Sequence, residues 1–383
     1  MLSYDAITEH SLAYGKSLKL TDDDVIVSWL PTYHDMGLIA CFITPSFHGI
    51  KTVQLSAFDW INRPQNLFKL IEKHRGTLCW LPNFAFEHLT NTLAKYAKKF
   101  DLSGMRAFIN CSEPCKSASF EKFADAFSLS GVTPNQLQCC YAMAETVFGV
   151  TQTNLGEAPR KIFVKPESLN RGDNIQLRSQ GDSSQSLIST GTCVDGISIT
   201  IRDEDGVALS DDTIGEITIS GKYLFSGYNK DTERTAKALQ NGEYKTNDLG
   251  FIHQRELYVL GRIDDLIIIN GRNIYAHQVE ALIANIPGLK PGRSVAISQF
   301  DDRVGSEVMV VLAETDSSAV IDEDSIRQSI VQILQSELDI VPQHIELMTA
   351  GELIKTSSGK ISRSENSRRY SQRLAAKDHG KAA

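Results

Sequence analysis

The sequence has no apolar run long enough to cross a lipid bilayer. Its longest apolar stretches, residues 37–42 and 266–269, are far shorter than the roughly 20 residues that a membrane-spanning helix needs. An excess of positive charge is also lacking, because the formal net charge is −8. These absences argue against a membrane-spanning protein, and they leave nucleic acid and anionic membranes outside the expected partners.

Cysteine is present, but not in the spacing of a metal or redox motif. The seven cysteines include no Cys-x-x-Cys pair, and most lie in apolar runs. An odd number in this pattern predicts buried, reduced thiols rather than a disulfide framework. Cys111 and Cys115 lack a second ligand pair at zinc-site spacing, so a zinc site is not favoured. The first ten residues lack the features of an export signal, and we expect a cytoplasmic protein.

What is present is the composition of an ordinary globular protein. Hydrophobic residues make up 42% and charged residues 22%, and 383 residues predict a large domain with a second, smaller one. Between residues 25 and 140, short apolar runs alternate with amphipathic segments, which is the pattern of βαβ units around a mostly parallel sheet. The candidate strands are residues 25–30, 52–55, 78–81, 107–110 and 137–140, and the candidate helices are residues 63–74, 84–99 and 117–127.

The rest of the chain has a different texture. Residues 151–186 are polar and hold several proline and glycine residues, which predicts an irregular or inserted segment. Alternating runs then predict a β-rich subdomain, and later apolar runs predict a compact α+β unit. The expected fold class is α/β, with a large N-terminal domain that includes this subdomain and a small α+β C-terminal domain. The expected boundaries are residues 1–261, a hinge at 262–265, a small domain at 266–365 and a tail at 366–383.

Two motifs follow predicted buried strands, where open α/β sheets bind ligands. Residues 141–146 read Tyr-Ala-Met-Ala-Glu-Thr. They offer an aromatic face for a base, a carboxylate for a hard cation and a hydroxyl for an oxyanion. Residues 110–114 read Asn-Cys-Ser-Glu-Pro and end the preceding strand. Taken alone, the first motif also fits an ordinary strand-to-helix turn.

Two further sites lie later in the chain. Asp248 and Arg262 are separated by one predicted hairpin, and Asp264 follows directly. An exposed ion pair is the alternative interpretation of the first two. Residues 355–360 read Lys-Thr-Ser-Ser-Gly-Lys, which also fits a flexible polar loop. Each site is weak evidence by itself.

Together and in this order, the four sites resemble the superfamily of adenylate-forming enzymes, over the chain up to about Arg363. This superfamily includes acyl-CoA synthetases, luciferases and non-ribosomal adenylation domains. The resemblance implies that Tyr141 packs on adenine, that Glu145 binds the Mg²⁺ bridging the phosphates of ATP, and that Thr146 contacts the α-phosphate. Catalysis is thus assigned to Glu145, Thr146 and the lysine described next.

The resemblance also assigns roles to the other sites. Glu113 and Pro114 belong to the adenine-contacting loop, although Cys-Ser replaces the Gly-Ala usual before them. Asp248 holds both ribose hydroxyls with help from Arg262, and Asp264 is the hinge. Lys360 reaches the active site, where an ammonium neutralises charge that develops at the bridging oxygen. His34 is assigned to the wall of the acyl pocket that binds or gates the carboxylate. A purely structural role for this histidine is an equally weighted alternative.

One element of the family is missing from the 383 residues. The phosphate loop, of the form T/S-S/T-G-S/T-T-G-x-P-K, occurs nowhere, and the first residues resemble the segment that usually follows it. We therefore expect an incomplete large domain. Without this backbone cradle the β- and γ-phosphates lose their main ligand. Three explanations stay open: a truncated chain, a second chain that supplies the front, or a protein that binds adenylates without catalysis.

Two stretches indicate a branch of the superfamily. The long segment between Glu145 and Gly191 contains KIFVKPESL, and the small domain contains DLIIINGRNIYAHQVE. Both resemble fatty acyl-AMP ligases, which implies activation of a fatty or other carboxylic acid by ATP and transfer to the phosphopantetheine of an acyl carrier protein. The alternatives are an acyl-CoA synthetase with CoA as the acceptor, a non-catalytic adenylate-binding fragment, or a structural partner of an N-terminal half.

Overall fold

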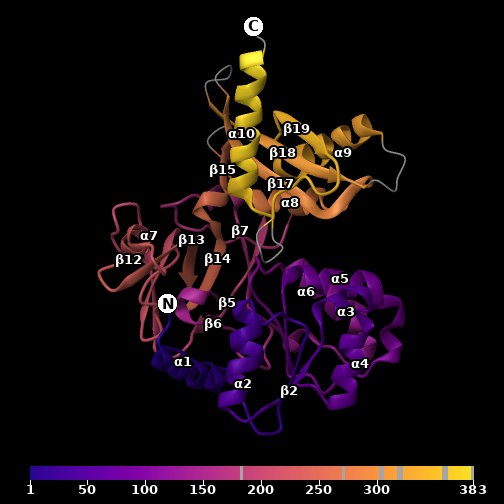
Figure 1. Cartoon of the computed structure of the whole chain (residues 1–383), viewed down its shortest axis with the longest axis vertical. Coiled ribbons are helices and arrows are strands. Elements are labelled where there is room, and N and C mark those ends of the chain that lie inside the picture. Colours follow the sequence, from indigo (N-terminus) through magenta and orange to yellow (C-terminus); the bar gives the residue numbers. More distant parts are fainter. Residues whose placement is uncertain (182–183, 270–271, 302–305, 317–321, 356–360, 381–383) are drawn as a thin grey trace. The chain divides into compact units, whose positions relative to one another are not determined.

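The structure is a computed structural model that describes residues 1–181, 184–269, 272–301, 306–316, 322–355 and 361–380 (Figure 1). The chain divides into two compact units, Met1–Leu260 and Gly261–Ala383. The expected hinge, residues 262–265, comes directly after this division and stays a prediction. None of the helices in the described ranges is long and apolar enough to cross a bilayer.

A seven-stranded sheet forms the centre of the first unit, in the order β2-β1-β3-β4-β5-β6-β9. The first five strands in that order run parallel, which confirms the predicted α/β fold, and the last two pair antiparallel. All four residues of β3 and of β4 are buried, as expected for parallel strands covered on both faces. The strands are β1 (Val25–Ser28), β2 (Lys51–Gln54), β3 (Leu78–Leu81), β4 (Ala107–Asn110), β5 (Leu137–Ala142), β6 (Gly149–Gln152) and β9 (Thr192–Cys193).

Amphipathic helices connect these strands. In α4, Leu67, Phe68 and Ile71 are buried on one face of the helix. The helix ends before Arg75, whose backbone has the left-handed conformation. The predicted helix at residues 84–99 is instead α5 followed by a 3₁₀ segment, Ala94–Lys99, in which only Ala97 is buried. The helices and π-helix of this part are α1 (Tyr4–Ser17), η1 (Met36–Ile43), α2 (Thr44–Phe47), α3 (Ala57–Asn62), α4 (Gln65–His74), α5 (Asn83–Leu93) and α6 (Ser117–Phe127).

The segment expected to be irregular holds a small antiparallel sheet. β7 (Lys161–Val164) pairs with β8 (Gln185–Ile188), so the expectation was too simple. Lys161 Nζ lies 2.6 Å from Glu121 Oε1 of α6, which ties this sheet to the first unit. The β-rich subdomain predicted after it is a five-stranded sheet, made of β10 (Ile197–Arg202), β11 (Gly215–Gly221), β12 (Leu239–Gln240), β13 (Glu243–His253) and β14 (Glu256–Arg262), with α7 (Thr232–Ala238) before β12.

The second unit has its own core on both faces of a three-stranded sheet. Met309 and Val311 of β18 pack with α8 and α9, whereas Val310 and Leu312 pack with Tyr370 of α10. Successive residues of a strand point to opposite faces, so β18 joins the two layers. The elements are β15 (Leu266–Ile269), β16 (Arg272–Tyr275), α8 (Ala276–Ile283), β17 (Leu289–Asp301), β18 (Ser306–Thr315), α9 (Glu323–Leu338), β19 (His344–Met348) and α10 (Arg363–Gly380).

Candidate functional site

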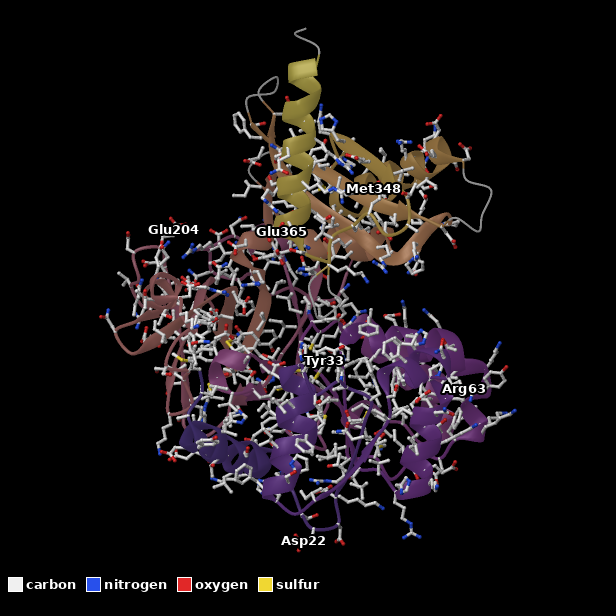
Figure 2. All side chains as sticks on the ribbon, viewed as in Figure 1. Asp22, Tyr33, Arg63, Glu204, Met348 and Glu365 are labelled. Carbon is white, nitrogen blue, oxygen red and sulfur yellow. The ribbon has the colours of Figure 1, made fainter. Side chains whose placement is uncertain are left out.

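The loops that follow the carboxyl ends of the parallel strands carry most of the predicted site residues. His34 lies in the loop after β1, Glu113 follows β4, and Tyr141 and Glu145 lie at the end of β5 and just beyond it. Tyr33, labelled in Figure 2, lies in the first of these loops and its side chain is exposed. Open α/β sheets bind ligands at this edge.

The structure brings Tyr141 and Asp248 into direct contact, although they lie far apart in sequence. The Tyr141 hydroxyl donates to Asp248 Oδ2 at 2.5 Å. Burial, followed by the nearby carboxylate, raises the pKa of Tyr141 well above its usual value, so the phenol stays a donor. An irregularity in the register between β11 and β13 precedes Asp248, and Asn247 has a φ of +61° there. Such bulges change the direction of side chains next to active sites.

Glu145 is held by one tyrosine and lies near a second, and the sequence analysis missed both. Tyr228 donates to Glu145 Oε1 at 2.9 Å, and burial followed by this bond raises the pKa of Tyr228. Burial also raises the pKa of Tyr244, with further contributions from Glu145, Tyr228 and Asp248. Both carboxylates therefore act electrostatically on Tyr244, which connects the surroundings of Glu145 with those of Asp248.

Thr146 has a different environment from the one that its predicted role requires. Its side chain is fully buried, and Oγ1 lies 3.1 Å from the carbonyl oxygens of Met143 and Phe148. Val147, the next residue, has φ +69° and ψ −58°, and Phe148 N–H donates across it to Thr146 O at 2.9 Å. This is a strained γ-turn, rare for a β-branched residue. In this structure Thr146 supports the turn, and its contact with a phosphate stays a prediction.

The loop with Glu113 and Pro114 is anchored on the next helix. Phe84 N–H, in the first turn of α5, donates to Glu113 Oε2 at 2.9 Å, and a carboxylate is favourable at a helix N-terminus. Pro114 is exposed. Asn110 at the end of β4 donates to Asn83 Oδ1 at 2.9 Å. The Glu113 carboxylate therefore positions the loop in this structure, while the contact of the loop with adenine stays a prediction.

His34 lies two residues before the π-helix η1 begins at Met36. Its Nδ1 lies 2.6 Å from Asp35 Oδ1, and the same oxygen accepts from Met36 N–H at 2.8 Å. A glycine is required at position 37, because a Cβ on Gly37 would lie 2.2 Å from Pro31 O. π-Helical segments are frequent at functional sites, and Asp35 fixes the orientation of the imidazole. The assignment of His34 to the acyl pocket stays a prediction.

The remaining predicted residues belong to the second unit. Arg262 ends β14, and Asp264 is exposed in the short 3₁₀ helix Ile263–Asp265. Lys360 lies outside the described residues. Lys355 and Ile361, on either side of that loop, form an antiparallel bridge.

An arginine that the sequence analysis did not single out joins two of these segments. Arg363 Nη1 lies 2.5 Å from Asp265 Oδ1, and Arg363 Nη2 lies 2.6 Å from Glu280 Oε1. Burial raises the pKa of Glu280 although Arg363 opposes this shift. Arg363 therefore ties the start of α10, just after the Lys355–Ile361 bridge, to the segment of the predicted hinge.

The comparison with protein families explains why these residues occur together. The model described as AMP-binding enzyme matches residues 1–229. The chain belongs to the AMP-binding enzyme family. This confirms the adenylate-forming resemblance, and the relatives include fatty acyl-AMP ligases, the kind of enzyme that the sequence resembles. A medium-chain-fatty-acid–[acyl-carrier-protein] ligase, JamA of Moorena producens, is 30% identical over 95% of this chain and 64% of its own length. The long-chain-fatty-acid–AMP ligase FadD26 of Mycobacterium marinum is 28% identical over 93% of this chain and 64% of its own length.

Solved structures agree with this family. One from a study of fatty acyl-adenylate ligases of E. coli and L. pneumophila has a TM-score of 0.88 at 28% identity, covering 98% of this chain and 68% of that one. The L. pneumophila fatty acyl-adenylate ligase in complex with acyl adenylate and pyrophosphate has a TM-score of 0.69 at 26% identity, covering 98% and 66%. This AMP-binding chain thus spans 64% of the length of the curated relatives described above.

Glu145 is the residue of this AMP-binding chain to which Mg²⁺ binding is assigned. Among the described residues, no group of three or more His, Cys, Asp or Glu side chains could hold a metal ion. Mg²⁺ is commonly bound by one or two carboxylates together with phosphates and water. Glu145 fits this role, because it is half-buried and Tyr228 engages only one of its oxygens.

The seven cysteines are free thiols, as predicted. Five of them are buried, but Cys115 is half-buried and Cys193 is exposed.

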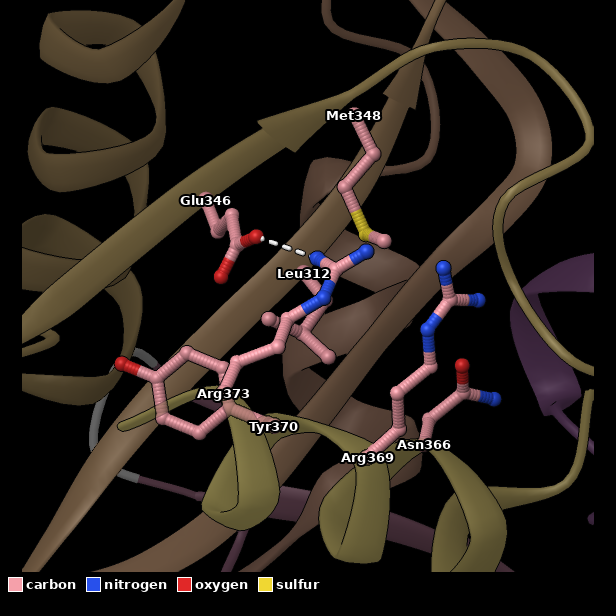
Figure 3. Close-up of a pocket in the computed structure, with 7 residues that line it drawn as sticks. All are labelled: Leu312, Glu346, Met348, Asn366, Arg369, Tyr370 and Arg373. Atoms are coloured by element: carbon pink, nitrogen blue, oxygen red, sulfur yellow. Dashed lines mark hydrogen bonds and ion pairs between the residues drawn. The ribbon is translucent and has the colours of Figure 1, made fainter. Parts of the chain in front are cut away.

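Two hollows lie elsewhere in this AMP-binding chain. One, between α10 and the sheet of the second unit, is lined by residues that include Glu346, Arg369 and Arg373 (Figure 3). Its volume of about 10 Å³ holds one water at most. The other, of about 300 Å³, is an open groove lined by residues of α1, η1 and α2. Neither contains a predicted site residue.

Proposed function

We propose that this chain is the larger part of a fatty acyl-AMP ligase, which converts a carboxylic acid and ATP into acyl-AMP and pyrophosphate. The observation that carries the proposal is the joined site of Tyr141, Asp248, Glu145 and Tyr228 at the carboxyl edge of the parallel sheet. It offers an aromatic face and two carboxylates, each held by a tyrosine hydroxyl, and the electrostatic influence of both carboxylates extends to Tyr244. A nucleotide with a bound cation requires this combination.

The contacts support a division of labour between the two carboxylates. Asp248 accepts a hydrogen bond from Tyr141, which orients the carboxylate, and this carboxylate would bind the two ribose hydroxyls. The Tyr141 ring would stack on adenine. Glu145 would hold Mg²⁺, which supplies charge neutralisation on the phosphates when bound. Lys360 would stabilise the charge that develops on the bridging oxygen.

The acceptor of the acyl group belongs to the proposal as well. JamA is described as an acyl-carrier-protein ligase, and we assign the same kind of acceptor, a phosphopantetheine thiol, to this chain. Free CoA is then a poor acceptor. In this proposal the small C-terminal domain rotates about Asp264 between the two half-reactions. The β7–β8 sheet restrains that rotation unless a carrier protein adds binding energy.

The test is ATP–pyrophosphate exchange with a fatty acid, measured on two proteins. The first is the 383-residue chain, which lacks the phosphate-loop sequence and is expected to exchange at a severely reduced rate. The second carries, in addition, the phosphate-loop region of a relative, and is expected to exchange at rates ordinary for an enzyme. In that protein Lys360→Ala should lower kcat strongly with little change in nucleotide affinity. Normal exchange in Lys360→Ala would contradict the proposal.

Product analysis of the longer protein then separates the two acceptors. With ATP, a fatty acid and CoA, acyl-AMP should accumulate, and a phosphopantetheinylated carrier protein should take up the acyl group. Efficient formation of acyl-CoA would instead assign the protein to the acyl-CoA synthetases. Nucleotide binding without exchange in the longer protein would favour a non-catalytic adenylate-binding module.

A further inference from the structure

Four ring side chains from three neighbouring strand ends pack together at the carboxyl edge of the parallel sheet. Trp29 follows β1, Trp60 lies in α3 after β2, and Phe84 and His88 lie in α5 after β3. These strands are adjacent, in the order β2-β1-β3. The Trp60 ring contacts the other three, with centroid distances of 3.8 Å to Trp29, 6.1 Å to Phe84 and 5.3 Å to His88. We call these four residues the aromatic cluster.

Three nitrogen atoms of the aromatic cluster are buried without a hydrogen-bond partner among the described residues. They are Nε1 of Trp29, Nε1 of Trp60 and Nε2 of His88. Trp29 is 6% exposed and Trp60 is fully buried. An unpaired buried polar group costs about 1–3 kcal/mol, and the great majority of such groups in proteins are paired. By contrast, the third indole of the chain, Trp80, donates to Tyr14 Oη at 3.1 Å.

The packing of the aromatic cluster is also unusual. The two indoles stack face to face, with centroids 3.8 Å apart and planes at 4°, whereas aromatic pairs prefer offset or edge-to-face arrangements at about 4.5–7 Å. Burial lowers the pKa of His88, so its imidazole is neutral at neutral pH. Phe84 is the exposed member of the cluster, at 49%.

We propose, on the basis of the proposed function, that the aromatic cluster receives the tail of the carboxylic acid and that this tail carries a neutral oxygen, as a hydroxyl, keto or ether group. Such an oxygen accepts hydrogen bonds from indole N–H groups, while the carbon chain packs against the rings. An unsubstituted alkyl tail leaves these donors unpaired, and sites with buried donors discriminate against ligands that cannot pair them. The cluster carries no charge at neutral pH, so a second carboxylate in the tail is excluded as the preferred group.

The experiment measures binding of acids to the purified 383-residue chain without ATP. The probes are dodecanoate, 3-hydroxydodecanoate and 12-hydroxydodecanoate, followed by calorimetry and by tryptophan fluorescence. The measured quantity is the ratio of Kd for dodecanoate to Kd for each hydroxy acid. For at least one hydroxy acid, Trp60→Phe should lower this ratio about fivefold, the worth of one hydrogen bond, because phenylalanine keeps an aromatic ring but has no N–H. Trp29→Phe serves as the second variant.

Trp80→Phe is the matched control, since it removes an indole N–H that already has a partner, and it should leave the ratio unchanged. The same ratios in the wild type, Trp60→Phe and Trp29→Phe would overturn the proposal, because ordered water alone would then occupy the donors. Absence of acid binding would overturn it too. The proposed function is tested separately by pyrophosphate exchange in the longer protein, so active enzyme with no effect of Trp60→Phe would refute only the choice of acid.

Discussion

Replacing Asp248 by asparagine tests the nucleotide site most directly. In the structure Asp248 Oδ2 accepts from the Tyr141 hydroxyl at 2.5 Å, and the carboxylate is predicted to accept from the ribose hydroxyls. Asparagine has the same shape and one remaining oxygen acceptor, but it has no charge. Hydrogen bonds to charged groups contribute about 1.5–3 kcal/mol, so Asp248→Asn should weaken AMP binding about 10- to 100-fold.

Tyr141→Phe should have a smaller effect. It keeps the aromatic face for adenine and removes only the hydroxyl that orients Asp248, so AMP binding should weaken about two- to tenfold. Isothermal titration calorimetry with AMP measures both variants on the 383-residue chain. Asp195→Asn is the matched control, because Asp195 forms an exposed ion pair with Lys16, and such pairs contribute little.

Two results would refute this reasoning. Wild-type affinity in Asp248→Asn would mean that the carboxylate does not contact the nucleotide. A greater loss in Tyr141→Phe than in Asp248→Asn would mean that the tyrosine hydroxyl itself is the ligand. Thermal unfolding of each variant separates loss of binding from loss of folding, because a unit of this size shifts its Tm by about 2–4 °C per kcal/mol.

The remaining predictions concern stability. Burial lowers the pKa of His10 to about 4, so the unfolded chain binds more protons than the folded one between pH 4 and 6.5. The free energy of unfolding should therefore fall by about 3 kcal/mol as pH drops through this window. Urea titrations should show that His10→Gln reduces this dependence of the free energy of unfolding on pH. Trp80→Phe should destabilise the chain by about 1 kcal/mol more than Trp29→Phe, because only the change at Trp80 removes a hydrogen bond, the one to Tyr14. Equal losses of unfolding free energy in chemical denaturation would contradict this. Arg363→Met leaves two partly buried carboxylates without their partner, so it should lower the free energy of unfolding of the second unit by about 3–5 kcal/mol. The measurement is amide hydrogen exchange, which should be faster throughout the second unit. Exchange unchanged from the wild type would refute the role of the ion pairs.

Elements buried on a continuous face were predictable from the sequence. The predicted bounds of β3, β4 and α6 agree with the structure residue for residue, because their apolar spacing matches the period of a strand or a helix. The β7–β8 sheet was missed, since most of its residues are only half-buried and leave no strong alternation. β13 was missed because the irregularity near Asn247 interrupts its pattern.

The candidate site was predictable only where a motif exists. Tyr141, Glu145 and Asp248 belong to recognisable motifs, whereas Tyr228 and Tyr244 reach the site through the fold alone. Tyr244 lies four residues before Asp248 in the sequence, but the irregularity near Asn247 interrupts the alternation that would have placed the two side chains on one face. The aromatic cluster was beyond prediction, since its members come from three separate strand ends that only the strand order brings together.

The γ-turn at Val147 makes stability a poor guide to this part of the site. Its backbone conformation costs roughly 1–3 kcal/mol, while its fully buried side chain contributes about 1.5–3 kcal/mol. Glycine would relieve the first and lose the second, so Val147→Gly should melt close to the wild type. The same change gives the peptide between Thr146 and Phe148 freedom to leave the turn. A screen that selects variants by melting temperature would accept this one, even though the residues before it no longer hold a single arrangement.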